Sequence, residues 1–159
     1  MLSYEYTEII FLIMTIQQID LQLSNLDHYS DLMILPELTE DKQNIYASST
    51  VSFFKFARKF ININYVKKPD IVLEQRSIDW FGPTLLFTTA ALTQNPELVS
   101  VALNVLSNYI SDYFKGQRAP NIKINIVIQK SKTEYTNFMY EGPKDGLTEI
   151  EKVIEKLKK

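Results

Sequence analysis

The sequence predicts an α+β fold in which helices pack against a small, mainly antiparallel sheet, within a single domain over residues 1–159. Three observations favour it: a long apolar helix over about 96–115, an alternating strand with a returning partner near 122–140, and a one-sided C-terminal helix. Helices, a strand, the long helix, a hairpin and a last helix follow one another along the chain, an order typical of α+β domains. A chain of 159 residues is long enough to bury one sizeable core.

The long helix has clear start and stop signals. Asn95 precedes Pro96, and an asparagine side chain can accept hydrogen bonds from the first helical turn while proline is tolerated at its first position. Gly116 is a candidate left-handed C-terminal cap. The polar residues between them form one narrow stripe: Ser100, Asn104, Ser107, Asn108, Ser111 and Lys115. A stripe this narrow predicts a helix buried on more than one side, and the alternative is that part of its apolar face docks a partner.

The hairpin and the last helix are predicted from periodicity. Isoleucines at 122, 124, 126 and 128 alternate with other residues, as in a half-buried strand, and 135–140 supplies the returning strand. Thr148 and Glu151 match a capping box at the start of the last helix. Its apolar positions lie at helical spacing: Ile150, Val153, Ile154 and Leu157.

The rest of the chain is predicted segment by segment. The expected strands are 4–14 (or a helix from Thr7), 61–65 and 70–76. The expected helices are 16–29, a face from Phe53 to Phe60 capped by Ser49 or Thr50, and a short apolar helix over 84–93. The segments 39–49 and 77–81 are expected to be a loop and a turn.

Composition excludes several chemistries. The chain has no cysteine and one histidine, His28, so disulfides, thiolate nucleophiles, cysteine metal sites and two-histidine sites are excluded. The sequence indicates no metal and no cofactor, since it has no phosphate loop and no metal-ligand spacing. The longest apolar runs are too short to span a membrane and no signal peptide is visible, so we expect a soluble cytoplasmic protein.

The net charge of -2 hides a segregation of charge along the chain. Residues 1–41 hold eight acidic residues and no lysine or arginine, while 42–69 hold six basic residues and no acid. Residues 113–133 hold five more basic residues and no acid. If these blocks stay apart in space, the surface has an acidic pole and a basic face.

A polar cluster at a predicted strand end is the first candidate site. It consists of Glu74, Arg76, Asp79 and Trp80, and binding groups collect at such positions. Arginine and tryptophan are also frequent interface anchors. The alternative is a structural turn in which Arg76 pairs with an acid and Trp80 lies in the core.

A basic and aromatic stretch is the second candidate. Its cations could neutralise phosphates and its aromatic rings could stack on unpaired bases. The cations are Lys55, Arg58, Lys59, Lys67 and Lys68, and the rings are Phe53, Phe54, Phe56, Phe60 and Tyr65. Against nucleic acid, the phenylalanines fall at helical core spacing and the chain is slightly acidic.

The missing catalytic motifs and the segregated charge favour a non-enzymatic protein that acts through protein contacts, such as an adaptor, an immunity or defence component, or a subunit of an assembly. Its partner would be another protein or further copies of the chain. One alternative is a hydrolase or transferase using Glu74, Arg76 and Asp79. The other is a protein that binds nucleic acid through residues 53–68.

Overall fold

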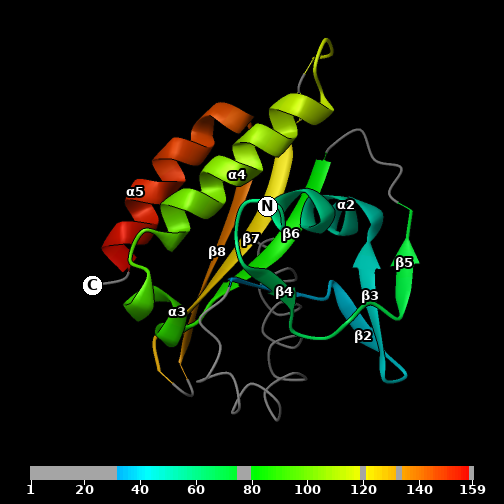
Figure 1. Cartoon of the computed structure of the whole chain (residues 1–159), viewed down its shortest axis with the longest axis horizontal. Helices are drawn as coiled ribbons and strands as arrows, with labels where there is room; N and C mark the ends of the chain where they lie inside the picture. The colour runs from blue at the N-terminus through cyan, green and yellow to red at the C-terminus, as the bar shows by residue number, and fades with distance from the viewer. Residues whose placement is uncertain (1–31, 75–79, 119–120, 132–133, 158–159) are drawn as a thin grey trace, which may run out of the picture.

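The computed structural model describes residues 32–74, 80–118, 121–131 and 134–157. The predictions for 4–14 and 16–29 lie outside these residues. The described chain forms an α+β fold with two sheets and helices packed on them, as the sequence predicts (Figure 1).

The larger sheet has five strands in the order β4-β1-β6-β7-β8. They are β4 (Ile63–Tyr65), β1 (Leu32–Leu35), β6 (Trp80–Phe87), β7 (Ile122–Gln129) and β8 (Tyr135–Gly142). The smaller sheet, at the side of the molecule in Figure 1, has the order β2-β3-β5. Its strands are β2 (Leu38–Glu40), β3 (Gln43–Ala47) and β5 (Ile71–Leu73).

Both sheets are mixed, so the prediction of a mainly antiparallel sheet is wrong. Strand β6 pairs with β7 in parallel, as do β1 with β4 and β3 with β5, while β1–β6, β2–β3 and β7–β8 are antiparallel. The cause is the connections: helices α3 (Thr89–Gln94) and α4 (Leu98–Tyr113) carry the chain from the end of β6 back to the start of β7. A crossover of this kind produces parallel neighbours.

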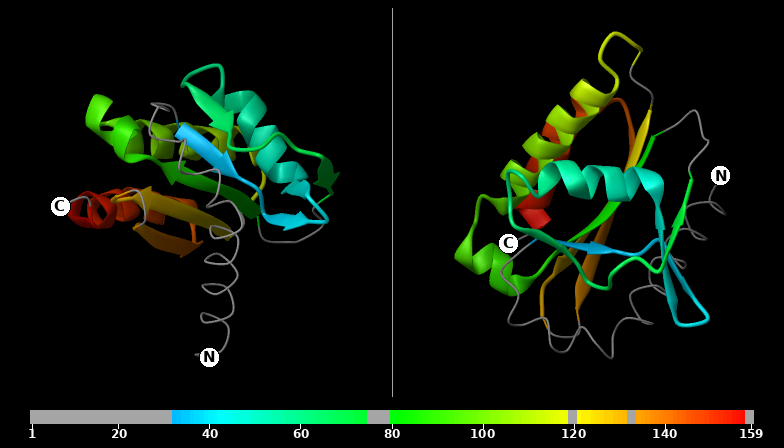
Figure 2. Two further views of the ribbon diagram at one scale, coloured as in Figure 1. Left: turned by 90° about the horizontal axis from the view of Figure 1, so that it is seen from below. Right: turned by 45° about the vertical axis from the view of Figure 1, so that its right-hand side comes forward.

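Three helices cover one face of the larger sheet (Figure 2). Helices α2 (Ser48–Ala57), α4 and α5 (Leu147–Leu157) contribute buried side chains to one core cluster, which includes the inward isoleucines of β7. Helices α4 and α5 run side by side (Figures 1 and 2). The long helix is confirmed, although it starts at Leu98. The Asn95 side chain accepts a hydrogen bond from the Glu97 N–H at 3.2 Å in the turn before the helix. Gly116, after the end of the helix, has a φ of 80°, as a left-handed residue should.

The predicted helix over 84–93 is wrong for its first half. Residues up to Phe87 belong to β6, and only Thr89–Gln94 are helical. Strand β6 lies between β1 and β7 and is buried on both faces, so its sequence is a continuous apolar run without strand alternation. Thr88 then caps α3, because its hydroxyl oxygen accepts from the Ala91 N–H at 3.1 Å.

The predicted loop over 39–49 contains a hairpin of β2 and β3. Asp41 and Lys42 form its turn with φ of 51° and 63°, a left-handed pair that matches the twist of the strands. The helix near Phe53, the strand near 61–65, the hairpin of β7 and β8 and the C-terminal helix are confirmed. The predicted strand over 70–76 is confirmed for its described part, where β5 covers Ile71–Leu73. Three predicted N-caps are wrong. The N-cap of α2 is Ala47, that of α4 is Glu97 instead of Asn95, and Thr148 lies inside α5, where its hydroxyl donates to the Asp145 carbonyl.

No helix within the described ranges has the combined length and hydrophobicity that crossing a lipid bilayer requires.

Candidate functional site

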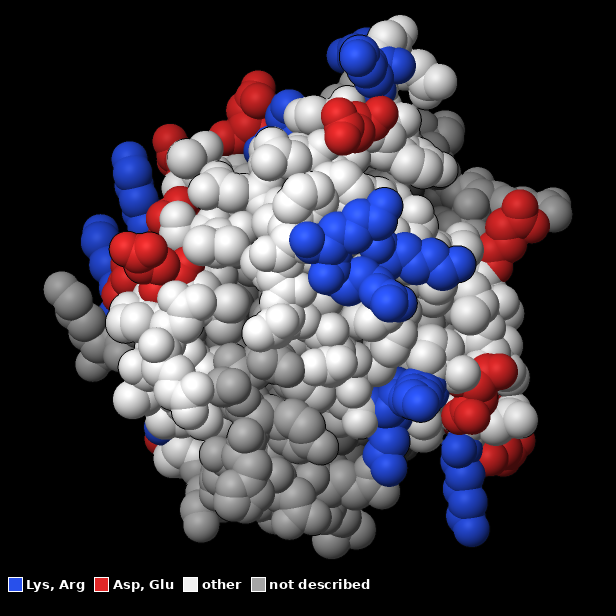
Figure 3. All heavy atoms as spheres, in the orientation of Figure 1, with Lys and Arg blue, Asp and Glu red and all other residues white. Residues whose placement is uncertain are grey.

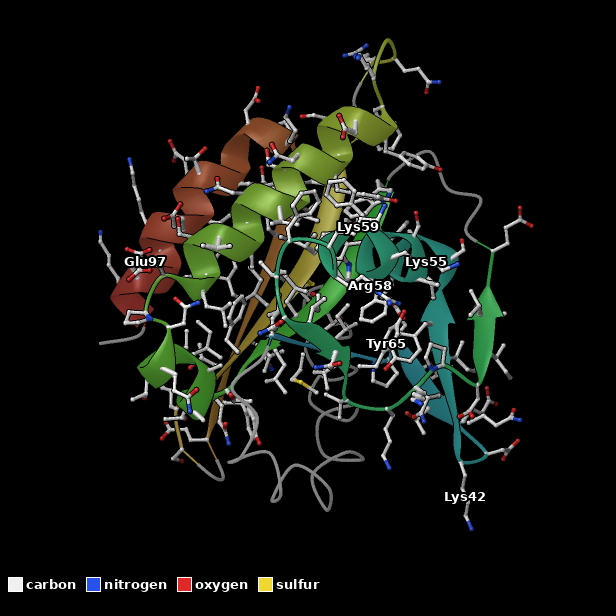
Figure 4. All side chains as sticks on the ribbon, viewed as in Figure 1. Lys42, Lys55, Arg58, Lys59, Tyr65 and Glu97 are labelled. Atoms are coloured by element: carbon white, nitrogen blue, oxygen red, sulfur yellow. The ribbon has the colours of Figure 1, made fainter. Side chains whose placement is uncertain are left out.

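Three cations gather on the outer side of α2. Lys55, Arg58 and Lys59 are exposed and lie together in Figures 3 and 4, and we call them the basic face. Their spacing of three and four residues places them on one side of the helix end. Phe53 and Ala57 point the opposite way and are 0% exposed, so core packing fixes which side the cations occupy.

No described acidic side chain pairs with the basic face. Within the described part of the chain, neither the Lys55 nor the Lys59 ammonium group has an ion pair or hydrogen bond, and the Arg58 guanidinium lies 6.0 Å from the centre of the Phe54 ring. Like charges four residues apart on a helix cost about 0.2–0.5 kcal/mol. The negative end of the helix dipole offsets part of this cost. The fold therefore gains little from the cluster itself.

An aromatic patch adjoins the basic face. Phe60 follows Lys59 directly and is 63% exposed, and Tyr113 at the end of α4 is 60% exposed. Two further rings connect them. The centre of the Phe56 ring lies 5.1 Å from that of Phe60 and 5.4 Å from that of Tyr109, and the Tyr109 ring stacks on Tyr113 with their centres 5.7 Å apart. We call Phe56, Phe60, Tyr109 and Tyr113 the aromatic patch. Phe60 and Tyr113 are the exposed rings of this group, while Phe56 is half-buried and Tyr109 is buried beneath them. Exposed aromatic side chains anchored on a buried ring are available for an interaction surface.

The two remaining cations of the predicted basic stretch lie beyond Tyr65. Lys67 is half-buried and Lys68 is exposed in the segment that leads from β4 to β5. Tyr46 fixes this segment, because its hydroxyl donates to the Lys67 carbonyl at 2.5 Å. The Tyr65 ring packs on the rings of Tyr46 and of Phe54 in α2, with ring centres 4.9 Å and 4.2 Å apart. These contacts hold the segment against the helix that carries the basic face.

Sequence reasoning missed the residue that caps α2. Ala47 has no side chain that can cap the helix. The Glu37 carboxylate takes this role: it accepts hydrogen bonds from the Ala47 N–H at 3.0 Å and from the Thr50 hydroxyl at 2.5 Å. Burial raises the pKa of Glu37, and hydrogen bonds from Thr50 and from the backbone of Ala47 and Glu37 lower it by less. Since Glu37 lies ten residues before Ala47, no local capping pattern could have indicated it.

The first candidate cluster from the sequence is only partly visible. Arg76 and Asp79 lie outside the described residues, and Glu74 is exposed just after β5. Trp80 is 5% exposed and packs on Tyr109 at 5.8 Å, as the alternative reading of a core tryptophan expects. A Cβ at Gly82 would lie 2.7 Å from the Trp80 ring, so this glycine leaves room for the indole.

A groove of about 320 Å³ lies between α4 and the start of α5. Its floor includes Leu103 and Leu147, and Asn104, Ser107 and Glu151 are among its polar walls. Lys144 at its rim donates to the Ser111 hydroxyl at 2.6 Å. In the portion of the chain that the structure places, no group of three or more acidic or histidine side chains is arranged to hold a metal ion.

The sequence matches no protein-family model, and comparisons with curated proteins and with solved structures found no significant match.

Proposed function

We propose that this chain is a non-enzymatic binding protein that holds a partner protein through the basic face and the aromatic patch. The observation that carries the proposal is the juxtaposition of three cations, with which no described acidic side chain pairs, and two rings that are more than half exposed. Docking would bury Phe60 and Tyr113 and give the cations acidic partners. Interface energy commonly concentrates in such aromatic and arginine side chains.

A protein partner fits this surface better than nucleic acid does. With the five cations of the stretch 55–68, at most about five phosphates could be neutralised, which gives a modest electrostatic affinity. The net charge of -2 would oppose a polyanion, whereas a protein needs only a local acidic segment. Phe60 directly follows Lys59, and the rings of Phe56 and Tyr109 connect it to Tyr113, so an apolar anchor lies next to a charged rim.

The test is site-specific photocrosslinking in the native cell. A photoreactive residue replaces Lys59, and the matched control replaces Lys152, an exposed lysine on α5. The proposal expects an adduct at position 59 that resists nuclease, is removed by protease and is absent at position 152. Charge reversal of Lys55 and Arg58 should abolish it.

Two results would contradict the proposal. An adduct at position 59 that nuclease removes would show that the basic face binds nucleic acid and not a protein. Equal labelling at positions 59 and 152 would show that the basic face holds no particular partner. Folding of the variants is checked by thermal melting, because exposed substitutions away from caps and cores change stability by about 0.5 kcal/mol or less.

A further inference from the structure

The groove between α4 and the start of α5 combines an apolar floor with polar walls. The floor residues Leu103 and Leu147 are each 3% exposed. Two side chains of opposite charge, Lys144 and Glu151, line the same groove. Its volume of about 320 Å³ lies at the lower end of the range for small-molecule sites. The groove therefore has room for a small polar compound.

The two opposite charges do not pair with each other. The Lys144 ammonium donates to the Ser111 hydroxyl at 2.6 Å. The Glu151 carboxylate is half-buried and has neither an ion pair nor a hydrogen bond among the residues that the structure places. Asp145 also lines the groove but is exposed, so Glu151 is the carboxylate that a compound inside the groove would meet. A partly buried charge without a partner costs desolvation energy that the fold does not recover.

The arrangement of the helices separates the two charges along the groove. Helices α4 and α5 run in opposite directions (Figure 1). Lys144 contacts Ser111 near the end of α4, whereas Glu151, one turn into α5, lies further towards the start of α4, where Asn104 lines the groove. Asn104 and Ser111 are about 10 Å apart along the helix axis, at about 1.5 Å per residue. Charged hydrogen bonds of about 2.8 Å at both ends leave about 5 Å between the charged groups of a ligand.

We propose that this groove binds a small zwitterion whose ammonium and carboxylate are joined by a short aliphatic chain, an ω-amino acid of about four or five carbons. Its ammonium donates to Glu151, and its carboxylate accepts from Lys144, which has three N–H donors and uses one for Ser111. Its methylene chain lies on Leu103 and Leu147. The site is separate from the basic face and does not depend on the protein partner proposed above.

The first experiment is isothermal titration calorimetry of the purified full chain with 5-aminopentanoate. The proposal expects one saturable site per chain. Pentylamine and pentanoate each lack one charged group, and glycine is too short to reach both ends, so all three should bind at least about tenfold more weakly. No saturable binding of 4-aminobutyrate or 5-aminopentanoate up to millimolar concentrations would overturn the proposal. Equal affinity for pentylamine or glycine would also overturn it, because the ligand would then not contact both charges.

The second experiment locates the contacts. Glu151→Gln and Lys144→Gln should each raise the dissociation constant of 5-aminopentanoate by about tenfold or more. The matched controls are Glu149→Gln and Lys152→Gln, which make the same charge changes at exposed positions of α5 that do not line the groove. They should leave the dissociation constant within about twofold. Equal weakening by the controls would show that the ligand binds elsewhere.

Ligand selectivity distinguishes a lost contact from a damaged fold. Glu151→Gln should abolish the preference for 5-aminopentanoate over pentanoate and keep the preference over pentylamine. Lys144→Gln should do the reverse, because each variant removes the contact to one end of the ligand only. A variant that merely unfolds the groove would lose both preferences together, and that result for both variants would contradict the proposed contacts.

Discussion

The Glu37 carboxylate accepts a hydrogen bond from the Thr50 hydroxyl at 2.5 Å and thereby joins the segment after β1 to the first turn of α2. The same carboxylate accepts from the Ala47 N–H. One acidic residue thus satisfies two donors at the start of the helix whose other end carries Lys55, Arg58 and Lys59. The negative charge also lies at the positive end of the helix dipole. This contact therefore fixes the start of the helix, while core packing of Phe53 and Ala57 fixes the side on which the basic face lies.

The raised pKa of Glu37 predicts a pH dependence of stability. Because the folded-state pKa lies above the ordinary value of 4.5, the folded protein binds this proton more tightly than the unfolded chain does. Its contribution to stability is therefore fully present below about pH 4.5 and is lost as pH rises through the folded-state pKa. We expect the free energy of unfolding of the wild type, minus that of Glu37→Gln, to fall over this window. Urea titrations of both proteins at a series of pH values measure it, and a difference that rises with pH would contradict the assignment.

Tyr46 predicts a second stability effect, in the segment that packs against α2. Its hydroxyl is the donor to the Lys67 carbonyl, and the side chain is 0% exposed. Tyr46→Phe leaves that carbonyl without its donor, so we expect a loss of about 1–3 kcal/mol in the free energy of unfolding. Tyr113→Phe is the matched control, because Tyr113 is 60% exposed and its hydroxyl can bond to water. Urea denaturation measures both variants. An equal loss in the two would mean that the hydrogen bond from Tyr46 to Lys67 does not stabilise the fold more than a bond from a hydroxyl to water.

Local patterns predicted the elements whose signals lie within one segment. The alternation in β7, the periodicity of α4 and the left-handed Gly116 were all readable, because each rests on residues close together in the chain. Strand β6 was misread because a strand buried on both faces loses its alternation. The parallel pairing of β6 and β7 was missed for a related reason: it depends on where a long crossover returns.

The candidate site divides in the same way. The three cations of the basic face could be predicted to share a surface, since their spacing alone places them on one side of a helix. The aromatic patch could not, because it joins Phe60 after α2 to Tyr113 of α4 through contacts between residues distant in sequence. Glu37 is a third case, in which a cap comes from outside the helix and its flanks.

Ile126 provides a test of the strand orientation in β7. It is 0% exposed and faces the helices, with Phe138 opposite on β8. Ile126→Lys would bury an unpaired charge, and we expect a loss of about 3–5 kcal/mol in the free energy of unfolding. The control is Asn121→Lys, one residue before the strand at an exposed position. Thermal melting compares the two, and a wild-type melting temperature for Ile126→Lys would refute the orientation.

The turn after β8 gives the last prediction, which depends on two glycines and one tyrosine. The Tyr140 hydroxyl donates to the Pro143 carbonyl at 2.5 Å, and its ring crosses Gly142 and Gly146. A Cβ at Gly146 would overlap the Tyr140 hydroxyl, so Gly146→Ala must displace the ring and break the bond. We expect a loss of about 1–3 kcal/mol in the free energy of unfolding, as for other overpacked contacts.

A double-mutant cycle separates this cause from others. In a Tyr140→Ala background the three atoms nearest to the new methyl group are removed, so most of the cost of Gly146→Ala should disappear. Gly116→Ala is the matched control: its cost comes from a φ of 80° with no atom within 4 Å of the added Cβ, and it should be the same in both backgrounds. If Gly146→Ala costs as much without the Tyr140 ring as with it, the glycine is required for another reason. Otherwise the ring of Tyr140 explains why the chain from β8 to α5 has glycine at position 146.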